Sequence, residues 1–259
     1  MKEEKLTDSS EKYAWYSALK PSWYVEQMKG WTMASYMLLF AGLGIILGMT
    51  VAQTITVVSI LTLLAGMLGF TTTVATTNAK PVNGVFGLVS AIIYIIVAAG
   101  AKNYNDVLLQ TTYIILLDIP ILVLPAWAKD VDKKVRFLAE EGKGLRNWIL
   151  TAVFFVVVLG ALYYSDTHFF ISPRPLIDSL AATIGITGAM LTTLRFSESY
   201  VFWFLQGLFS VTLWGITAVQ GDANWVLFVT YIMYIANDFV SFIDKGTPWF
   251  HHEKHTVKA

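Results

Sequence analysis

The chain contains no cysteine, which excludes disulfide bonds and thiolate metal sites. Charge is also scarce, because Asp, Glu, Lys and Arg make up 14% of the 259 residues, whereas soluble domains carry about 25%. Hydrophobic residues make up 56% of the chain. These proportions predict an integral membrane protein.

Motifs of the common enzyme classes are missing as well. The sequence has no nucleophile elbow, HExxH pair, P-loop or CxxC motif. We therefore expect no enzyme activity, no cofactor and no nucleic-acid partner. His251, His252 and His255 could bind a metal adventitiously, but an unstructured tail is the preferred interpretation. A channel would need a ring of like charges or a filter-like repeat, and neither is visible.

The first thirty residues are polar and lack the early apolar run of a secretory signal. Two interpretations stay open for residues 12–30. They form either a solvated tail or a short helix in the membrane interface, anchored by Trp15, Tyr16, Trp23 and Tyr24.

Long apolar runs fill most of the remaining chain. No charged residue occurs from Gly30 to Ala79, and this stretch is too long for one helix because about 20 residues cross the hydrocarbon core. Breaks at polar residues and prolines predict eight transmembrane helices, near 32–51, 54–76, 84–101, 107–127, 147–165, 176–194, 199–220 and 224–243. The expected fold class is all-α integral membrane, with halves at 31–127 and 147–244, an N-terminal segment at 1–30, a basic loop at 128–146 and a tail at 245–259.

The distribution of basic residues predicts the orientation. With the N-terminus in the cytoplasm, sixteen of the eighteen Lys and Arg residues lie inside, and only Lys102 and Arg174 lie outside. This is a strong positive-inside asymmetry. Both termini are therefore expected to be cytoplasmic.

The two halves resemble each other in sequence. GFTTTVATT at 69–77 aligns with GITGAMLTT at 185–193, and further on Gly87 aligns with Gly207 and Tyr94 with Trp214. An even number of spans separates the partners, so the repeats are expected to be parallel. Such repeats predict two three-helix bundles, from about 54–127 and 176–244, with a site between them, plus an N-terminal and a connecting helix.

A stripe of aromatic and small residues marks the seventh predicted span. Tyr200, Trp203, Gly207, Ser210 and Trp214 follow at spacings of three and four, which places them on one helix face. Lipid-facing surface would be aliphatic, so we expect this face to point inward. The next span holds Asn237 and Asp238, and the fourth holds Asp118. Carboxylates at membrane depth are costly and indicate function.

These residues resemble the PnuC family of nicotinamide riboside and vitamin transporters. The resemblance is carried by LRFSESYVFWFLQGLFSVTLW at 194–214, YIMYIAND at 231–238, NGVFGLVSAIIY at 83–94 and NYNDVLLQTTY at 103–113, and covers roughly residues 60–245. It implies parallel pseudo-symmetry as in SWEET sugar transporters, facilitated diffusion with trapping by a cytoplasmic kinase, and assembly of some members as trimers. Tyr200 stands where the nicotinamide riboside members have the first Trp of a WxxW motif, and Gly207 where they have Asn.

The expected solute-binding residues come from both halves. They are Tyr200, Trp203, Gln206, Gly207, Trp214, Asn237, Asp238, Asp118 and Gln110. Aromatic rings can stack on a flat or cationic ring, and the amides of Gln206, Gln110 and Asn237 can bond ribose hydroxyls and a carboxamide. The two acids could pair with a positive ring or couple transport to protons. The alternatives are interfacial anchoring for Trp203, core packing for Trp214, hydration for Asp238, and a protonated Asp118 bonded to backbone freed by Pro120.

We therefore expect a bacterial inner-membrane transporter of nicotinamide riboside that contacts lipid and a small solute. Deoxynucleosides, thiamine, riboflavin and a proton-coupled mechanism remain alternatives.

Overall fold

The computed structural model describes residues 15–124, 134–139 and 142–251. Within these residues the chain is helical, and its β pairing is limited to an isolated bridge between Arg136 and Phe196. Eight segments of this part are long and apolar enough to cross a membrane, as predicted. They are α3 (Met33–Val51), α4 (Val57–Thr77), α5 (Val82–Gly100), α6 (Tyr104–Tyr113) continued by η2 and α7, α9 (Gly144–His168), α10 (Pro175–Thr193), α11 (Ser199–Val219) and α12 (Val226–Ile243).

Local signals explain where several of these helices begin. The side chain of Thr32 accepts a hydrogen bond from the Ser35 amide at the start of α3. At the start of α4, Thr56 and Ser59 form a capping box, which pairs two helix donors that otherwise lack partners. Pro175 occupies the first turn of α10, where its missing amide hydrogen costs nothing.

The fourth span differs from the prediction of one helix over 107–127. It begins at Tyr104, changes to a π-helical turn in η2 (Ile114–Asp118), and ends with α7 (Ile119–Val123). Pro120 lies in the first turn of α7 and has no amide hydrogen for a regular α-helical ladder. Residues 125–127 of the predicted helix lie outside the described part.

Six of the spans form a closed ring. Around it, α4 packs on α5, α5 on α6, α6 on α10, α10 on α11, α11 on α12, and α12 on α4. Each half thus contributes three consecutive helices, and the two junctions between halves, α6 with α10 and α12 with α4, correspond to each other. This arrangement confirms the predicted pair of three-helix bundles.

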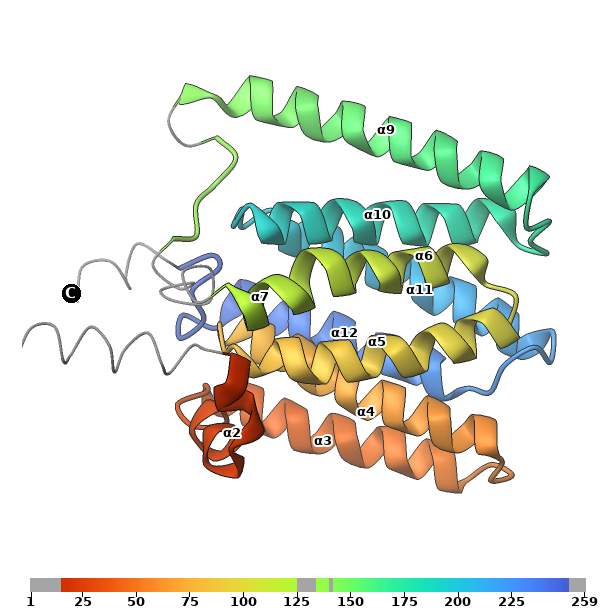
Figure 1. Cartoon of the computed structure of the whole chain (residues 1–259), viewed down its shortest axis with the longest axis horizontal. Coiled ribbons are helices and arrows are strands. Elements are labelled where there is room, and N and C mark those ends of the chain that lie inside the picture. The colour runs from red at the N-terminus through yellow and green to blue at the C-terminus, as the bar shows by residue number, and fades with distance from the viewer. Residues whose placement is uncertain (1–14, 125–133, 140–141, 252–259) are drawn as a thin grey trace, which may run out of the picture.

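The other two spans lie at opposite edges of the bundle (Figure 1). Helix α3 packs on α4 and α12, and α9 packs on α10 and α6. Each of them therefore precedes the first helix of a repeat and packs against it. The predicted N-terminal and connecting helices are thus α3 and α9, and both pack outside the ring of six.

The N-terminal segment contributes η1 (Trp15–Leu19) and α2 (Pro21–Gln27). Trp23 is buried in a cluster with Trp31 and Phe70, so this residue packs against the bundle rather than anchoring a lipid-facing helix. Residues 1–14, residues 128–133 and 140–141 of the basic loop, and His252 and His255 lie outside the described residues.

The helix ends define two faces of the molecule. We call the end of the bundle that holds Met33 and Ile243 the terminal face, and the end that holds the α5–α6 and α11–α12 loops the distal face; in Figure 1 the terminal face is at the left.

Candidate solute site

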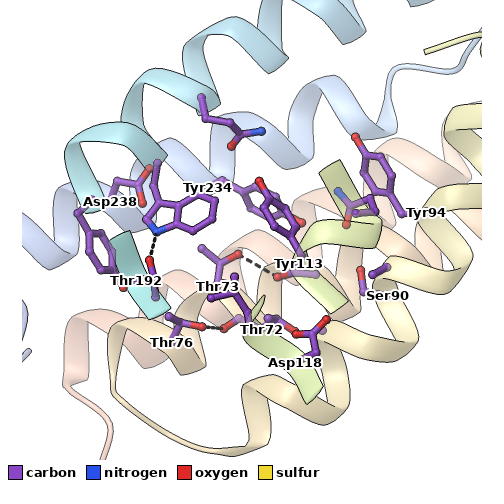
Figure 2. Close-up of a pocket in the computed structure, with 18 residues that line it drawn as sticks. Thr72, Thr73, Thr76, Ser90, Tyr94, Tyr113, Asp118, Thr192, Tyr234 and Asp238 are labelled. Carbon is purple, nitrogen blue, oxygen red and sulfur yellow. Dashed lines mark hydrogen bonds between the residues drawn. The ribbon is translucent and has the colours of Figure 1, made fainter. Parts of the chain in front are cut away.

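A cavity lined by 18 residues lies inside the six-helix ring. Every helix of the ring contributes at least one side chain to its wall. Figure 2 shows these side chains, which come from both halves of the chain. The site therefore lies where the repeat predicted it, between the two bundles.

Helix α4 presents threonine hydroxyls to the cavity. Thr73 donates to the Gly69 carbonyl at 3.0 Å, and Thr76 donates to the Thr72 carbonyl at 2.9 Å. Because these hydroxyl hydrogens bond carbonyls of the same helix, the threonine oxygens of α4 can act toward a solute only as hydrogen-bond acceptors. Gly69 has no side chain, which lets the Tyr234 and Ser90 hydroxyls approach its backbone.

Helices α5 and α6 and the π turn form the rest of the first-half wall. Gly87, Ser90 and Tyr94 line the cavity from α5, and Gln110, Tyr113 and Asp118 line it from α6 and η2. The Asp118 carboxylate lies directly against Gly87, so that a Cβ atom there would collide with it. The carboxylate is 5% exposed, and its Oδ2 atom has no hydrogen-bond partner.

The second-half wall is mainly aromatic. Trp203 donates from its indole nitrogen to Thr192 at 3.0 Å, and its ring meets Tyr113 edge-on, with 5.4 Å between centroids. Tyr200 bonds Thr77 through its hydroxyl at 3.0 Å. Gln206 donates to Ser210 at 2.7 Å, and Tyr234 and Asp238 complete this wall from α12. The wall therefore offers ring faces together with an amide oxygen and a carboxylate.

Six of the nine predicted residues line the cavity, namely Gln110, Asp118, Tyr200, Trp203, Gln206 and Asp238. The other three lie behind the wall. Asn237 is fully buried and donates to Thr77 at 2.8 Å, a contact that also orients Tyr200. Gly207 makes room for Ile235 of α12. Trp214 is fully buried in the core, as its alternative interpretation predicted.

The cavity is closed toward the distal face by a layer of buried polar side chains. Tyr94 and Trp214 both donate to one oxygen of Asp106, at 3.1 and 3.0 Å. The Tyr94 hydroxyl also lies 2.9 Å from that of Tyr231. Tyr94 and Trp214 are the pair aligned by the repeat, so matching positions of the two halves meet on a single carboxylate.

Toward the terminal face a second, smaller cavity shares Thr72, Thr76 and Asp118 with the first. Trp249 forms part of its wall and is 2% exposed. It belongs to a segment after α12, residues 244–251, which we call the C-terminal strap. The indole of Trp249 donates to the Thr76 carbonyl at 3.0 Å, and its own carbonyl accepts from Ser197. The strap therefore covers the terminal end of the cavity system.

Several wall residues were missed by the sequence reasoning, chiefly Thr72, Thr73, Thr76, Ser90, Tyr94, Tyr113, Thr192 and Tyr234. The threonines at 72, 73 and 76 could have been found, because they share one face of an apolar helix. Tyr113 and Tyr234 give no such signal, since single tyrosines are common in membrane helices.

A family model for nicotinamide mononucleotide transporters matches residues 59–249, most of the chain. The chain belongs to this family. Among curated proteins it is similar to the nicotinamide riboside transporter PnuC of Neisseria mucosa, with 24% identity over 229 residues that cover 86% of this chain and 84% of the relative. Among solved structures it is similar to the crystal structure of the vitamin B3 transporter PnuC, with a TM-score of 0.71, 21% identity and coverage of 92% and 99% of the two chains.

Membership in the PnuC family confirms the resemblance seen in the sequence. It makes the chain a multi-pass membrane transporter, in agreement with the prediction that it is not an enzyme.

Proposed function

We propose that this PnuC-family chain carries nicotinamide riboside, or a closely related unphosphorylated vitamin or nucleoside, across a bacterial inner membrane. The observation that carries the proposal is the cavity between the two halves. Its aromatic faces suit a flat ring, and its amide and hydroxyl oxygens suit ribose and carboxamide groups.

The charge of the wall favours an unphosphorylated solute. Among the described residues that line the cavity there is no Lys, Arg or His, whereas Asp118 and Asp238 are both present. A phosphate buried here would meet carboxylates without a cation to compensate it, which is unfavourable at membrane depth. The nucleoside is therefore preferred over its monophosphate.

The proposed cycle is facilitated diffusion, made one-way when a cytoplasmic kinase phosphorylates the imported solute. The excess of Lys and Arg near the terminal face supports a cytoplasmic position for that face. The cavity system, which extends toward the strap on the same face, supports release on that side.

The test is binding and uptake with purified protein. Calorimetry should give saturable binding of nicotinamide riboside and weak or no binding of nicotinamide mononucleotide. Proteoliposomes should accumulate the riboside only when they contain a nucleoside kinase and ATP. If the monophosphate binds more tightly, the proposal is wrong. Tight binding of thiamine, riboflavin or a deoxynucleoside instead would select the alternative solute within the same fold.

Assembly as a homotrimer stays a prediction of the family resemblance. Helix α9 has the smallest buried share of the eight candidate spans, so most of its surface is left for lipid or a second copy. Light scattering of the detergent-solubilised protein measures the oligomeric state.

A further inference from the structure

Two polar atoms on the cavity wall stand out because neither has a hydrogen-bond partner within the described part of the chain. They are the Tyr113 hydroxyl and the Oδ2 atom of Asp118. Buried polar groups normally have partners, since leaving one unpaired costs its full desolvation penalty. The other wall hydroxyls of Thr73, Thr76 and Tyr200 are bonded within the protein. An unpaired acid and an unpaired hydroxyl on a cavity wall are expected where a ligand supplies the missing partner.

The π-helical turn brings these two groups to the same side. Tyr113 and Asp118 are five residues apart, and in an α-helix such residues lie about 140° apart around the axis. In η2 the amide of Ile119 instead bonds the carbonyl of Ile114, five residues earlier. This wider turn brings residues five apart closer together around the axis, onto one side of the helix. Both side chains therefore enter the cavity, as Figure 2 shows.

Glycine at position 87 provides the space for the carboxylate. A Cβ atom at Gly87 would collide with Oδ1 of Asp118, so any larger residue would push the carboxylate away. At the aligned glycine of the second half, Gly207, the space beside the backbone is occupied by the side chain of Ile235 instead. The same offset of 120 residues aligns Asp118 with Asp238. Among the described helices, however, the combination of a π turn with a glycine that faces the carboxylate occurs in the first half only. The two halves are therefore unequal where the solute would bind.

We propose that Asp118, with Tyr113, forms a subsite for a positively charged or N–H-rich group of the solute, and that this subsite selects cationic ring compounds over neutral ones. The inference rests on the proposed function, because it places a charge preference inside the same cavity. A carboxylate taken out of water needs a positive partner. The cavity wall supplies none among its described residues, and the rings of Tyr113 and Trp203, which meet edge-on in the same wall, also favour a cation.

The experiment compares the binding of charged and neutral solutes to the wild-type protein and to a variant of nearly the same shape that lacks the charge of Asp118. Binding to the full-length protein is measured by calorimetry for nicotinamide riboside and thiamine, which are cations, and for reduced nicotinamide riboside, riboflavin and thymidine, which are neutral. Wild type should bind a cation more tightly than any neutral solute. Asp118→Asn should weaken cation binding by about tenfold or more, as loss of a charged hydrogen bond predicts, and change neutral binding by less than about twofold.

A pair of glycine variants tests the same subsite without removing its charge. Gly87→Ala should also weaken cation binding, because the new methyl group displaces the carboxylate. Gly44→Ala is the control, since a Cβ atom there meets nothing within 4 Å, and it should bind as wild type does. If Asp118→Asn does not fold, Gly87→Ala and Tyr113→Phe still provide the comparison.

The outcomes separate the two proposals. Equal binding of cations and neutral solutes by wild type, or equal losses for both in Asp118→Asn, overturns the charge subsite and leaves the transport proposal standing. Binding of no solute in the panel by wild type overturns the proposed function and the subsite with it.

Discussion

At the scale of single residues, the central carboxylate of Asp106 connects the two halves. It is fully buried, and the hydrogen bonds from Tyr94 and Trp214 converge on one of its oxygens. These donors come from α5 and α11, which correspond in the repeat. A single acid therefore joins matching positions of both bundles, and its role is to hold the ring together on the distal side of the cavity.

Replacing Asp106 by Ala should destabilise the protein by about 2–4 kcal/mol, because two buried donors lose their acceptor at about 1–3 kcal/mol each. The measurement is the free energy of unfolding in mixed micelles. Tyr231→Phe is the control, since it removes one hydroxyl contact but leaves both donors on Asp106. An Asp106→Ala variant as stable as wild type would show that this carboxylate does not join the halves.

Trp203 provides the largest ring of the cavity wall. Its removal in Trp203→Ala should weaken binding of a flat solute by about tenfold, the equivalent of about 1.4 kcal/mol of ring contact. Trp203→Phe keeps a ring and should lose less, although it also loses the bond to Thr192. Calorimetry with nicotinamide riboside measures both. Unchanged affinity in Trp203→Ala would leave this tryptophan with a packing role only.

At the scale of elements, the C-terminal strap explains why the cavity is covered at the terminal face. Trp249 bonds the end of α4, its ring packs 5.1 Å from Tyr200, and Thr247 is tied to the end of α12. The strap comes from the second half and contacts a helix of the first. A relative movement of the halves would therefore break its contacts.

Trp249→Ala should open the terminal end of the cavity. Because the chain has no cysteine, a single Thr72→Cys substitution reports access to the shared wall of the two cavities. A thiol reagent applied from the terminal face should label this cysteine severalfold faster when Trp249 is Ala. Lys29→Cys, exposed at the terminal face just before α3, is the control and should label at the same rate in both backgrounds. Equal rates at Thr72→Cys would mean that the strap does not limit access.

At the scale of the whole molecule, Arg174 connects loops of the two halves at the distal face. It precedes α10, and its guanidinium side chain is 3% exposed. In the α5–α6 loop it donates to Asn103 at 3.0 Å and to the Ala101 carbonyl. At the α11–α12 loop it donates to Asp222 at 3.0 Å and to Gln220. These loops occupy equivalent places in the two halves. One side chain thus ties the halves together at the face opposite the strap.

The pH dependence of this contact follows from Asp222. The hydrogen bond from Arg174, with the charge of Lys102, holds the pKa of the Asp222 carboxyl below its ordinary value. A lowered pKa means that the contact stabilises the fold above about pH 4 and is lost as the pH falls through the lower native pKa. Asp222→Asn should therefore lower the melting temperature at pH 7, and the difference should shrink below about pH 4. Lys102→Ala, whose ammonium is 3.7 Å from Asp222 and largely exposed, should have a smaller effect. A constant difference across pH would contradict this account.

The sequence by itself determined the eight spans, the repeat and the part of the aromatic wall that α11 contributes. These features are local, because hydrocarbon thickness sets the span length and helical spacing places Tyr200, Trp203 and Gln206 on neighbouring faces. Only the tertiary structure decided that Asn237 and Trp214 stand behind the wall, since this depends on which helices become neighbours. It also decided the direction of Asp118, because the π turn in η2 follows from packing and from Pro120 rather than from any periodic pattern.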